Sequence, residues 1–178
     1  MRIIGGRLKG QAIMPPAGYA ARPTTDYAKE GLFNTLVNEL DFESLAMLDL
    51  FSGTGSISYE AASRGCTDII SVEMNPANAR FIKKTAAALG LSGMQVVHHN
   101  VFDFLNICTK KFDLVFADPP YAIDNLAGIP DKVLGAGILN EGALFVMEHP
   151  GTFSFKEHPC FIKEKKYGNV HFSYFRNR

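Results

Sequence analysis

Residues 46–55, AMLDLFSGTG, decide the fold, because a short apolar run ends there in two glycines separated by one residue. The run predicts a buried strand over 46–50, and the glycines predict a tight turn that lets a ligand approach the backbone. A helix over 56–63 is expected to point its free amides and positive dipole end at the same space. The third glycine of a dinucleotide fingerprint would fall at Ser58, so no pyrophosphate site is predicted. A glycine turn that serves packing alone is the alternative.

On either side of this segment, apolar runs alternate with amphipathic stretches. The pattern predicts an α/β fold with a doubly wound, mainly parallel, seven-stranded Rossmann-like sheet. Two strand-like runs near the end, 161–166 and 170–175, predict an antiparallel hairpin that closes the sheet. The other expected strands cover 69–72, 95–98, 112–117 and 143–147, and the other expected helices cover 26–39, 75–89 and 126–134.

The start of the chain is expected to form a small extension of this core. Residues 2–14 hold two strand-like pieces between glycines and predict a hairpin, followed by a proline-rich loop. The run Thr24–Asp26 supplies N-cap chemistry for the helix that follows. We therefore expect a single domain over 1–178, in which 1–40 form a hairpin and helix extension and 41–178 form the core.

Polar residues follow the second and third strands, at the edge where the glycine turn lies. Glu73 can accept both hydrogen bonds of a vicinal ribose diol. Asp103 can accept a hydrogen bond from an adenine amino group while Val101 or Phe102 covers the ring. An aspartate that caps a short helix would look the same. The two positions together favour an adenosine-containing ligand.

The segment Asp118-Pro119-Pro120-Tyr121 follows the fourth strand. Its prolines stop the strand and fix a rigid, extended turn. Asp118 and the carbonyl of Pro119 can together accept both hydrogens of an amino group, and Tyr121 offers a face on which a base stacks. Accepting those hydrogens returns electron density to an aromatic amine, whose lone pair is otherwise delocalised into the ring. The segment therefore predicts a site that makes such an amine nucleophilic.

An adenosine ligand without a phosphate, beside an activated amine, points to S-adenosylmethionine. Asp49 would attract the ammonium group of this cofactor, and methyl transfer to the amine depends mainly on positioning and electrostatics. The expected catalytic residues are Asp118, Pro119, Pro120 and Tyr121. The expected cofactor contacts are Asp49, Phe51, Ser52, Gly53, Gly55, Glu73, Met74, Val101, Phe102, Asp103 and Asp118.

Composition and charge narrow the class of protein. The sequence has no apolar run near the ~18 residues that a membrane helix needs. Its three cysteines are odd in number and far apart, which argues against a disulfide framework or a metal site and suits a cytoplasmic protein. The net charge is zero, but 1–30 carry +3, 31–154 carry −7 and 155–178 carry +4. The basic ends can hold a polyanion, although charge scattered by chance is the alternative.

With these motifs the sequence resembles the class I, Rossmann-like S-adenosylmethionine methyltransferases. Asp49–Gly55 looks like their first motif, Glu73 like their acidic ribose binder, and Asp118–Tyr121 like their amino-methyltransferase motif. The chain is more similar still to the bacterial 16S rRNA (guanine-N2)-methyltransferases of the RsmD type. The segments that carry this second resemblance are 2–10, 22–26, 29–34 and 165–168.

The resemblance implies methylation of the exocyclic N2 of a guanine in a hairpin loop of 16S rRNA, within an assembling small ribosomal subunit. A loop base suits this reaction because its extrusion costs little stacking. Tyr27 and Lys29 stand where that family commonly has arginines, so one basic contact is lost and the other cannot bind phosphate bidentately. The expected protein is a monomer without a metal. The expected RNA contacts are Arg2, Arg7, Lys9, Arg22, Thr24, Lys29, Lys165 and Lys166.

Two other functions stay open from the sequence. A DNA adenine-N6 methyltransferase accepts the same segment 118–121, although such an enzyme usually carries an added recognition domain, for which 178 residues leave no room. A catalytically silent RNA-binding assembly factor of the same fold is the other, and the intact Asp118 and Tyr121 argue against it. A nicotinamide oxidoreductase is disfavoured because the third glycine is missing.

Overall fold

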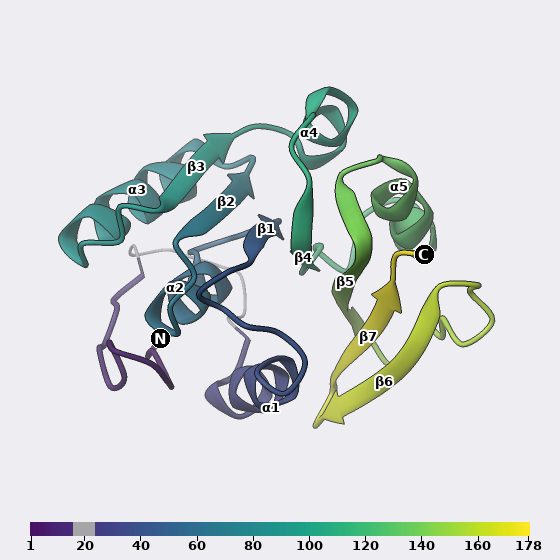
Figure 1. Cartoon of the computed structure of the whole chain (residues 1–178), viewed down its shortest axis with the longest axis horizontal. Helices are drawn as coiled ribbons and strands as arrows, with labels where there is room; N and C mark the ends of the chain where they lie inside the picture. Colours follow the sequence, from purple (N-terminus) through teal and green to yellow (C-terminus); the bar gives the residue numbers. More distant parts are fainter. Residues whose placement is uncertain (16–23) are drawn as a thin grey trace.

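One seven-stranded sheet organises the molecule, with strand order β3-β2-β1-β4-β5-β7-β6 (Figure 1). The computed structural model describes residues 1–15 and 24–178. The first five strands pair in parallel, whereas β7 runs antiparallel to both β5 and β6. The α/β fold and the closing hairpin predicted from the sequence are confirmed. The strands are β1 (Ala46–Leu50), β2 (Asp68–Glu73), β3 (Met94–His98), β4 (Phe112–Ala117), β5 (Leu139–Pro150), β6 (Phe161–Tyr167) and β7 (Val170–Arg176).

Helices cover both faces of this sheet, as the alternating pattern predicts. On one face, α1 (Asp26–Leu36), α2 (Ser56–Ser63) and α3 (Pro76–Ala88) pack against side chains such as Leu114 and Phe116 of β4. On the other face, α4 (Val101–Ile107), the 3-10 turn η1 (Leu126–Gly128) and α5 (Ile129–Gly135) pack against side chains such as Val115 and Ala117. Successive β4 residues thus enter opposite cores, which explains why the strand is apolar from Leu114 to Ala117. No helix within 1–15 or 24–178 has the length and apolar character that crossing a membrane requires.

Local capping chemistry sets several helix boundaries. The hydroxyl of Thr25 accepts a hydrogen bond from the amide of Ala28 at 3.2 Å and begins α1 where the sequence predicts. Asn75 caps α3, and Pro76 takes its first turn. The helix α4, which the sequence analysis does not predict, begins because the side chain of Asn100 accepts from the amides of Phe102 and Asp103. It was missed because seven residues are too few to reveal a helical period.

Several predicted elements differ from the structure. The helix expected over 26–39 ends at Leu36, and the helix expected over 126–134 is divided into η1 and α5. The strand expected over 143–147 extends to 139–150 as β5, because it continues to pair with β4 at one end and with β7 at the other. The hairpin expected over 2–14 is reduced to one bridge between Arg2 and Ala12. The proline-rich loop predicted after this segment lies outside the described residues.

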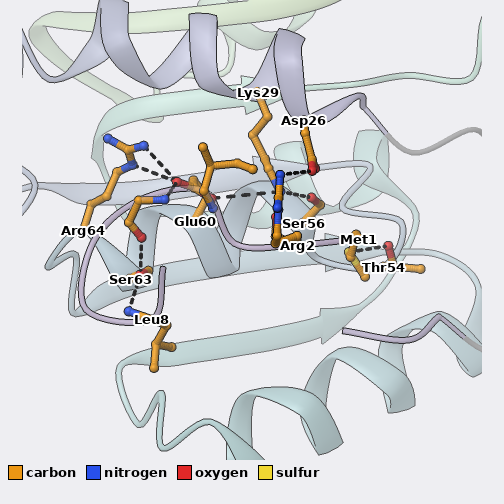
Figure 2. Close-up of polar contacts among 12 residues, drawn as sticks. Met1, Arg2, Leu8, Asp26, Lys29, Thr54, Ser56, Glu60, Ser63 and Arg64 are labelled. Atoms are coloured by element: carbon orange, nitrogen blue, oxygen red, sulfur yellow. Dashed lines mark hydrogen bonds and ion pairs between the residues drawn. The ribbon is translucent and has the colours of Figure 1, made fainter. Parts of the chain in front are cut away.

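The N-terminal segment also binds the side of α2 (Figure 2). Its own short pairing continues on both sides of the bridge, because the amides of Ile3 and Ile13 donate to the carbonyls of Gln11 and Met1. The amides of Ile4 and Gly5 each donate to the carboxylate of Glu60 at 2.8 Å. The amide of Leu8 donates to the hydroxyl of Ser63 at 2.9 Å. The segment is thereby attached to the helix that follows the glycine turn.

Candidate active site

A cavity of about 740 Å³ opens where β1, β2 and β4 end. The chain leaves β1 for β2 and β3 on one side, while β4 and β5 lie on the other, so the cavity sits at the point where the strand order reverses (Figure 1). Ligands of open α/β sheets bind in this crevice. The volume falls within the range of about 300–1,000 Å³ for small-ligand sites. The cavity therefore lies at the edge of the sheet where the sequence predicts the ligand site.

The glycine turn forms the floor of the cavity through an unusual backbone. Phe51, Gly53 and Gly55 all have positive φ, at 58°, 57° and 84°. A Cβ on Gly55 would lie 2.8 Å from the Tyr59 ring, so this glycine is required by the turn itself. Phe51 has no such freedom, and holding it there costs about 1–3 kcal/mol, which is typical of backbone at functional sites. Phe51 and Gly53 line the cavity, whereas Gly55, a predicted cofactor contact, does not line it and serves the turn.

Glu73 is fixed between two backbone amides at the end of β2. Its Oε2 accepts from the amide of Gly53 at 2.7 Å, and its Oε1 accepts from the amide of Asn75 at 2.7 Å. Each carboxylate oxygen can accept a further hydrogen bond, so the residue keeps the capacity for a diol. The spacing of 20 residues between Gly53 and Glu73 thus corresponds to a direct contact in the structure.

Asp49 is buried at the end of β1 and holds its place through Ser58. The Ser58 hydroxyl donates to Oδ2 of Asp49 at 2.6 Å and also contacts the hydroxyl of Ser71 at 2.7 Å. Burial raises the pKa of Asp49 to about 7, against hydrogen bonds that lower it. The serine that replaces the third glycine of a dinucleotide fingerprint therefore has a task of its own, which the sequence analysis missed.

The turn after β4 brings Asp118, Pro119, Pro120 and Tyr121 to the cavity, as predicted. Burial raises the pKa of Asp118 well above its usual range, and the nearby carboxylates of Glu148 and Asp49 raise it further. Tyr121 is 47% exposed and lies at the rim, where a base can reach its ring. The segment therefore presents a half-buried acceptor beside an accessible aromatic face.

Sequence reasoning missed one acidic residue at this site, Glu148 of β5. It is 5% exposed, and its Oε2 accepts from the Thr24 hydroxyl at 3.1 Å. Its Oε1 accepts from the Tyr121 hydroxyl at 3.4 Å. Burial raises its pKa to about 6. A charged residue within the apolar run ALFVMEHP is a signal that could have identified it.

Several predicted contacts need correction. Asp103 is exposed in the first turn of α4 and does not line the cavity, where Asn100 stands instead. Lys29 is only 1% exposed, because the helix period places it on the buried side of α1 with Leu32 and Phe33, so it cannot contact RNA. Thr24, a predicted substrate contact, lines the cavity. The other predicted cofactor contacts that line it are Ser52, Met74, Val101 and Phe102.

The remaining basic residues predicted to contact RNA lie at the surface. Arg2, Arg7 and Lys9 are exposed on the N-terminal segment, and Arg2 pairs with Asp26 at 3.2 Å. Lys165 and Lys166 are both exposed, although neighbours on a strand face opposite sides. Arg22 lies outside the described residues. No group of His, Cys, Asp and Glu side chains that could hold a metal ion occurs in 1–15 or 24–178.

Comparison with known proteins identifies the family to which this chain belongs. The family model described as Conserved hypothetical protein 95 matches residues 1–176. The Ribosomal RNA small subunit methyltransferase D of Buchnera aphidicola is 30% identical over 99% of this chain and 92% of its own. The protein of the same name from Escherichia coli is 32% identical over 83% of this chain and 74% of its own.

Solved structures show the same relationship. The structure of yhhF from Escherichia coli covers 100% of this chain and 98% of its own, at 30% identity and a TM-score of 0.85. The fold extends to the Thermus thermophilus enzyme RsmC in complex with AdoMet and guanosine, at 20% identity and a TM-score of 0.73, over 100% of this chain and 49% of that one. The chain belongs to the RsmD-type family of ribosomal RNA methyltransferases.

Proposed function

We propose that this protein transfers a methyl group from S-adenosylmethionine to the exocyclic N2 of a guanine in 16S rRNA. One observation carries the proposal. The cavity holds the carboxylates of Asp49, Glu73, Asp118 and Glu148, and its lining within the described residues includes no lysine or arginine. Buried carboxylates without cations are costly. A ligand that brings positive charge and hydrogen-bond donors would relieve that cost.

The donor set fits S-adenosylmethionine, which supplies an electrophilic methyl group on a sulfonium. Glu73 and Asp49 line the cavity. Glu73 would accept hydrogen bonds from a ribose diol, and Asp49 would attract an ammonium group. Val101 and Phe102 offer apolar contacts for an adenine ring. Phosphate would be repelled by this site, which agrees with the incomplete dinucleotide fingerprint.

The target amine would be held by the turn after β4. Asp118 and the carbonyl of Pro119 accept the two hydrogens of the amine, while the ring of Tyr121 supports the base. As the new nitrogen–carbon bond forms, the amine must release one proton. The carboxylate of Asp118 is placed to accept it, because burial and the neighbouring carboxylates raise its pKa.

The relatives named small subunit methyltransferase D support 16S rRNA as the substrate. Exposed Arg7, Lys9, Lys165 and Lys166 would approach phosphates beside the cavity. We place the reaction on an assembling small subunit in the cytoplasm, carried out by a monomer with one domain and no metal. The position of Asp118 in the lining of the cavity favours a base that leaves its helix or loop to enter the site.

The decisive experiment incubates the protein with methyl-labelled S-adenosylmethionine and small ribosomal subunits from cells that lack it. We expect label in 16S rRNA, recovered as N2-methylguanosine after digestion. Duplex DNA is the parallel substrate, and label that appears only there would replace this proposal with adenine-N6 methylation. Tight binding of cofactor and subunits without any label would favour a silent assembly factor.

Asp49→Asn is expected to stabilise the ligand-free protein at pH 8 and to weaken cofactor binding at least about tenfold. The pKa of Asp49 is about 7 in the fold, against an ordinary value of 3.8, so ionisation of the carboxylate favours unfolding. This cost grows between about pH 4 and pH 7 and is constant above, with an upper bound of about 4 kcal/mol.

Thermal unfolding of both proteins at pH 4 and pH 8 checks the sign of this effect. The melting temperature of Asp49→Asn should exceed that of the wild type at pH 8 by up to about 10 °C, and the gap should close at pH 4. Asp124→Asn, which changes an exposed aspartate, should show neither effect. An equal gap at both pH values would contradict the assignment to ionisation of Asp49.

A further inference from the structure

Glu148 is a buried carboxylate near the end of β5, directly after an apolar run. The four residues before it, Leu144 to Met147, are fully buried. Its two hydrogen-bond donors, the hydroxyls of Thr24 and Tyr121, are neutral, and the second is at a weak distance of 3.4 Å. No ion pair among residues 1–15 and 24–178 includes it. Since a carboxylate can accept about four hydrogen bonds, Glu148 has capacity left on the side that lines the cavity.

The register of the sheet places this carboxylate next to Asp118. Ala117 of β4 pairs with Met147 of β5 in parallel, so the residues that follow them, Asp118 and Glu148, lie side by side, although β5 continues beyond Glu148. Each carboxylate raises the cost of ionising the other. Two neighbouring acceptors in one cavity require a ligand with neighbouring donors. A single amino group satisfies Asp118 and the Pro119 carbonyl but leaves the remaining acceptor capacity of Glu148 unused.

The Watson–Crick edge of guanine carries this set of donors, the two hydrogens on N2 and the hydrogen on N1 beside them. We propose that Glu148 is a specificity-determining residue that accepts the N1 hydrogen of the target guanine while Asp118 and Pro119 hold its amine. The inference rests on the proposed function and assigns the base within it. Adenine offers a lone pair at N1, which would face the carboxylate and be repelled. Glu148 therefore excludes adenine although Asp118–Tyr121 would accept its amine.

Glu148→Gln tests this proposal, because it preserves shape and exchanges one acceptor for a donor. We would measure by calorimetry the binding of guanosine and of 2-aminopurine riboside to protein saturated with S-adenosylhomocysteine. The riboside of 2-aminopurine keeps the 2-amino group and has an unprotonated N1. The wild type should bind guanosine at least about tenfold more tightly, the equivalent of one hydrogen bond. In Glu148→Gln the preference should disappear or reverse, since the glutamine amide can donate to N1.

Glu141→Gln, an exposed glutamate on the same strand, is the matched control and should keep the wild-type preference. Equal weakening of both nucleosides by Glu148→Gln would mean that the residue supports only the shape of the cavity, and would overturn the inference. A wild type that binds guanosine weakly or without preference would overturn it too. The readout is binding and not turnover, so a preference that Glu148→Gln removes stands even if 16S rRNA is not methylated. Conversely, if 16S rRNA is methylated but Glu148→Gln keeps the wild-type nucleoside preference, the role of Glu148 is refuted and the proposed function is not.

Discussion

Asp118→Ala is expected to lower methyl transfer into 16S rRNA by at least about 10²–10³-fold and to leave cofactor affinity within a few-fold of the wild type. Asp118 is placed to accept hydrogens of the reacting amine and to take its proton, and the loss of one preorganised partner of the reacting group has effects of this size. The cofactor would keep Glu73, Asp49 and the glycine turn, none of which depends on Asp118 for its position. Single-turnover methylation of small subunits, with cofactor binding measured separately, separates the two effects.

Asp118→Asn provides the graded control. Its side-chain oxygen can still accept one hydrogen of the amine, but its amide cannot take up the proton, so its rate should lie between those of the wild type and Asp118→Ala. Both substitutions remove the negative charge of Asp118 beside Glu148. The pKa of Glu148 should therefore fall in both variants. Unchanged turnover in Asp118→Ala would refute the assigned role and would leave Tyr121 and Pro119 to position the amine alone.

The parts of the fold that sequence reasoning predicts well are those decided by near neighbours. The apolar run before Gly53 and the caps at Thr25 and Asn75 each act within a few residues, and all appear where expected. The glycine turn, Glu73 and the segment 118–121 were also predicted to meet, and all three line the cavity. This prediction needs only the rule that the strand ends of a parallel sheet meet at one edge. Local chemistry and one topological rule were sufficient for this much.

The errors come from contacts between residues far apart in the chain. Lys29 looked like a surface cation, but α1 presents it to the side of α2, where its Nζ donates to the Arg2 carbonyl and to the Ser56 hydroxyl at 3.1 Å. Thr24 and Glu148 are 124 residues apart and meet only when β5 lies beside β4. Neither partner of such a pair carries a local signal of the other. Burial of a charge can therefore be inferred from sequence, but its partner cannot.

Glu60→Gln is expected to destabilise the protein by about 3–5 kcal/mol, which is the cost of leaving a buried charge without its partner. Glu60 is fully buried at the centre of the contacts that hold the N-terminal segment (Figure 2). Arg64 donates to its Oε1 at 2.9 Å, and Nζ of Lys29 lies 3.9 Å from its Oε2. The amides of Ile4 and Gly5 complete the set. For a chain of this length the melting temperature should fall by roughly 10 °C.

A second variant tests whether Glu60→Gln loses stability because the charge of Glu60 is removed or because its side-chain packing changes. Lys29→Met combined with Glu60→Gln removes both buried charges, so the double variant should recover part of the stability that Glu60→Gln loses. Hydrogen exchange at the amides of Ile4 and Gly5 gives the local readout, because the neutral side chain of Glu60→Gln holds them less strongly. Glu157→Gln, at an exposed position, should leave both measurements unchanged. If Glu60→Gln kept these amides protected and the melting temperature intact, the N-terminal segment would be held by the burial of Ile3 and Ile13 alone. The buried charges would then have no structural role in joining that segment to α2.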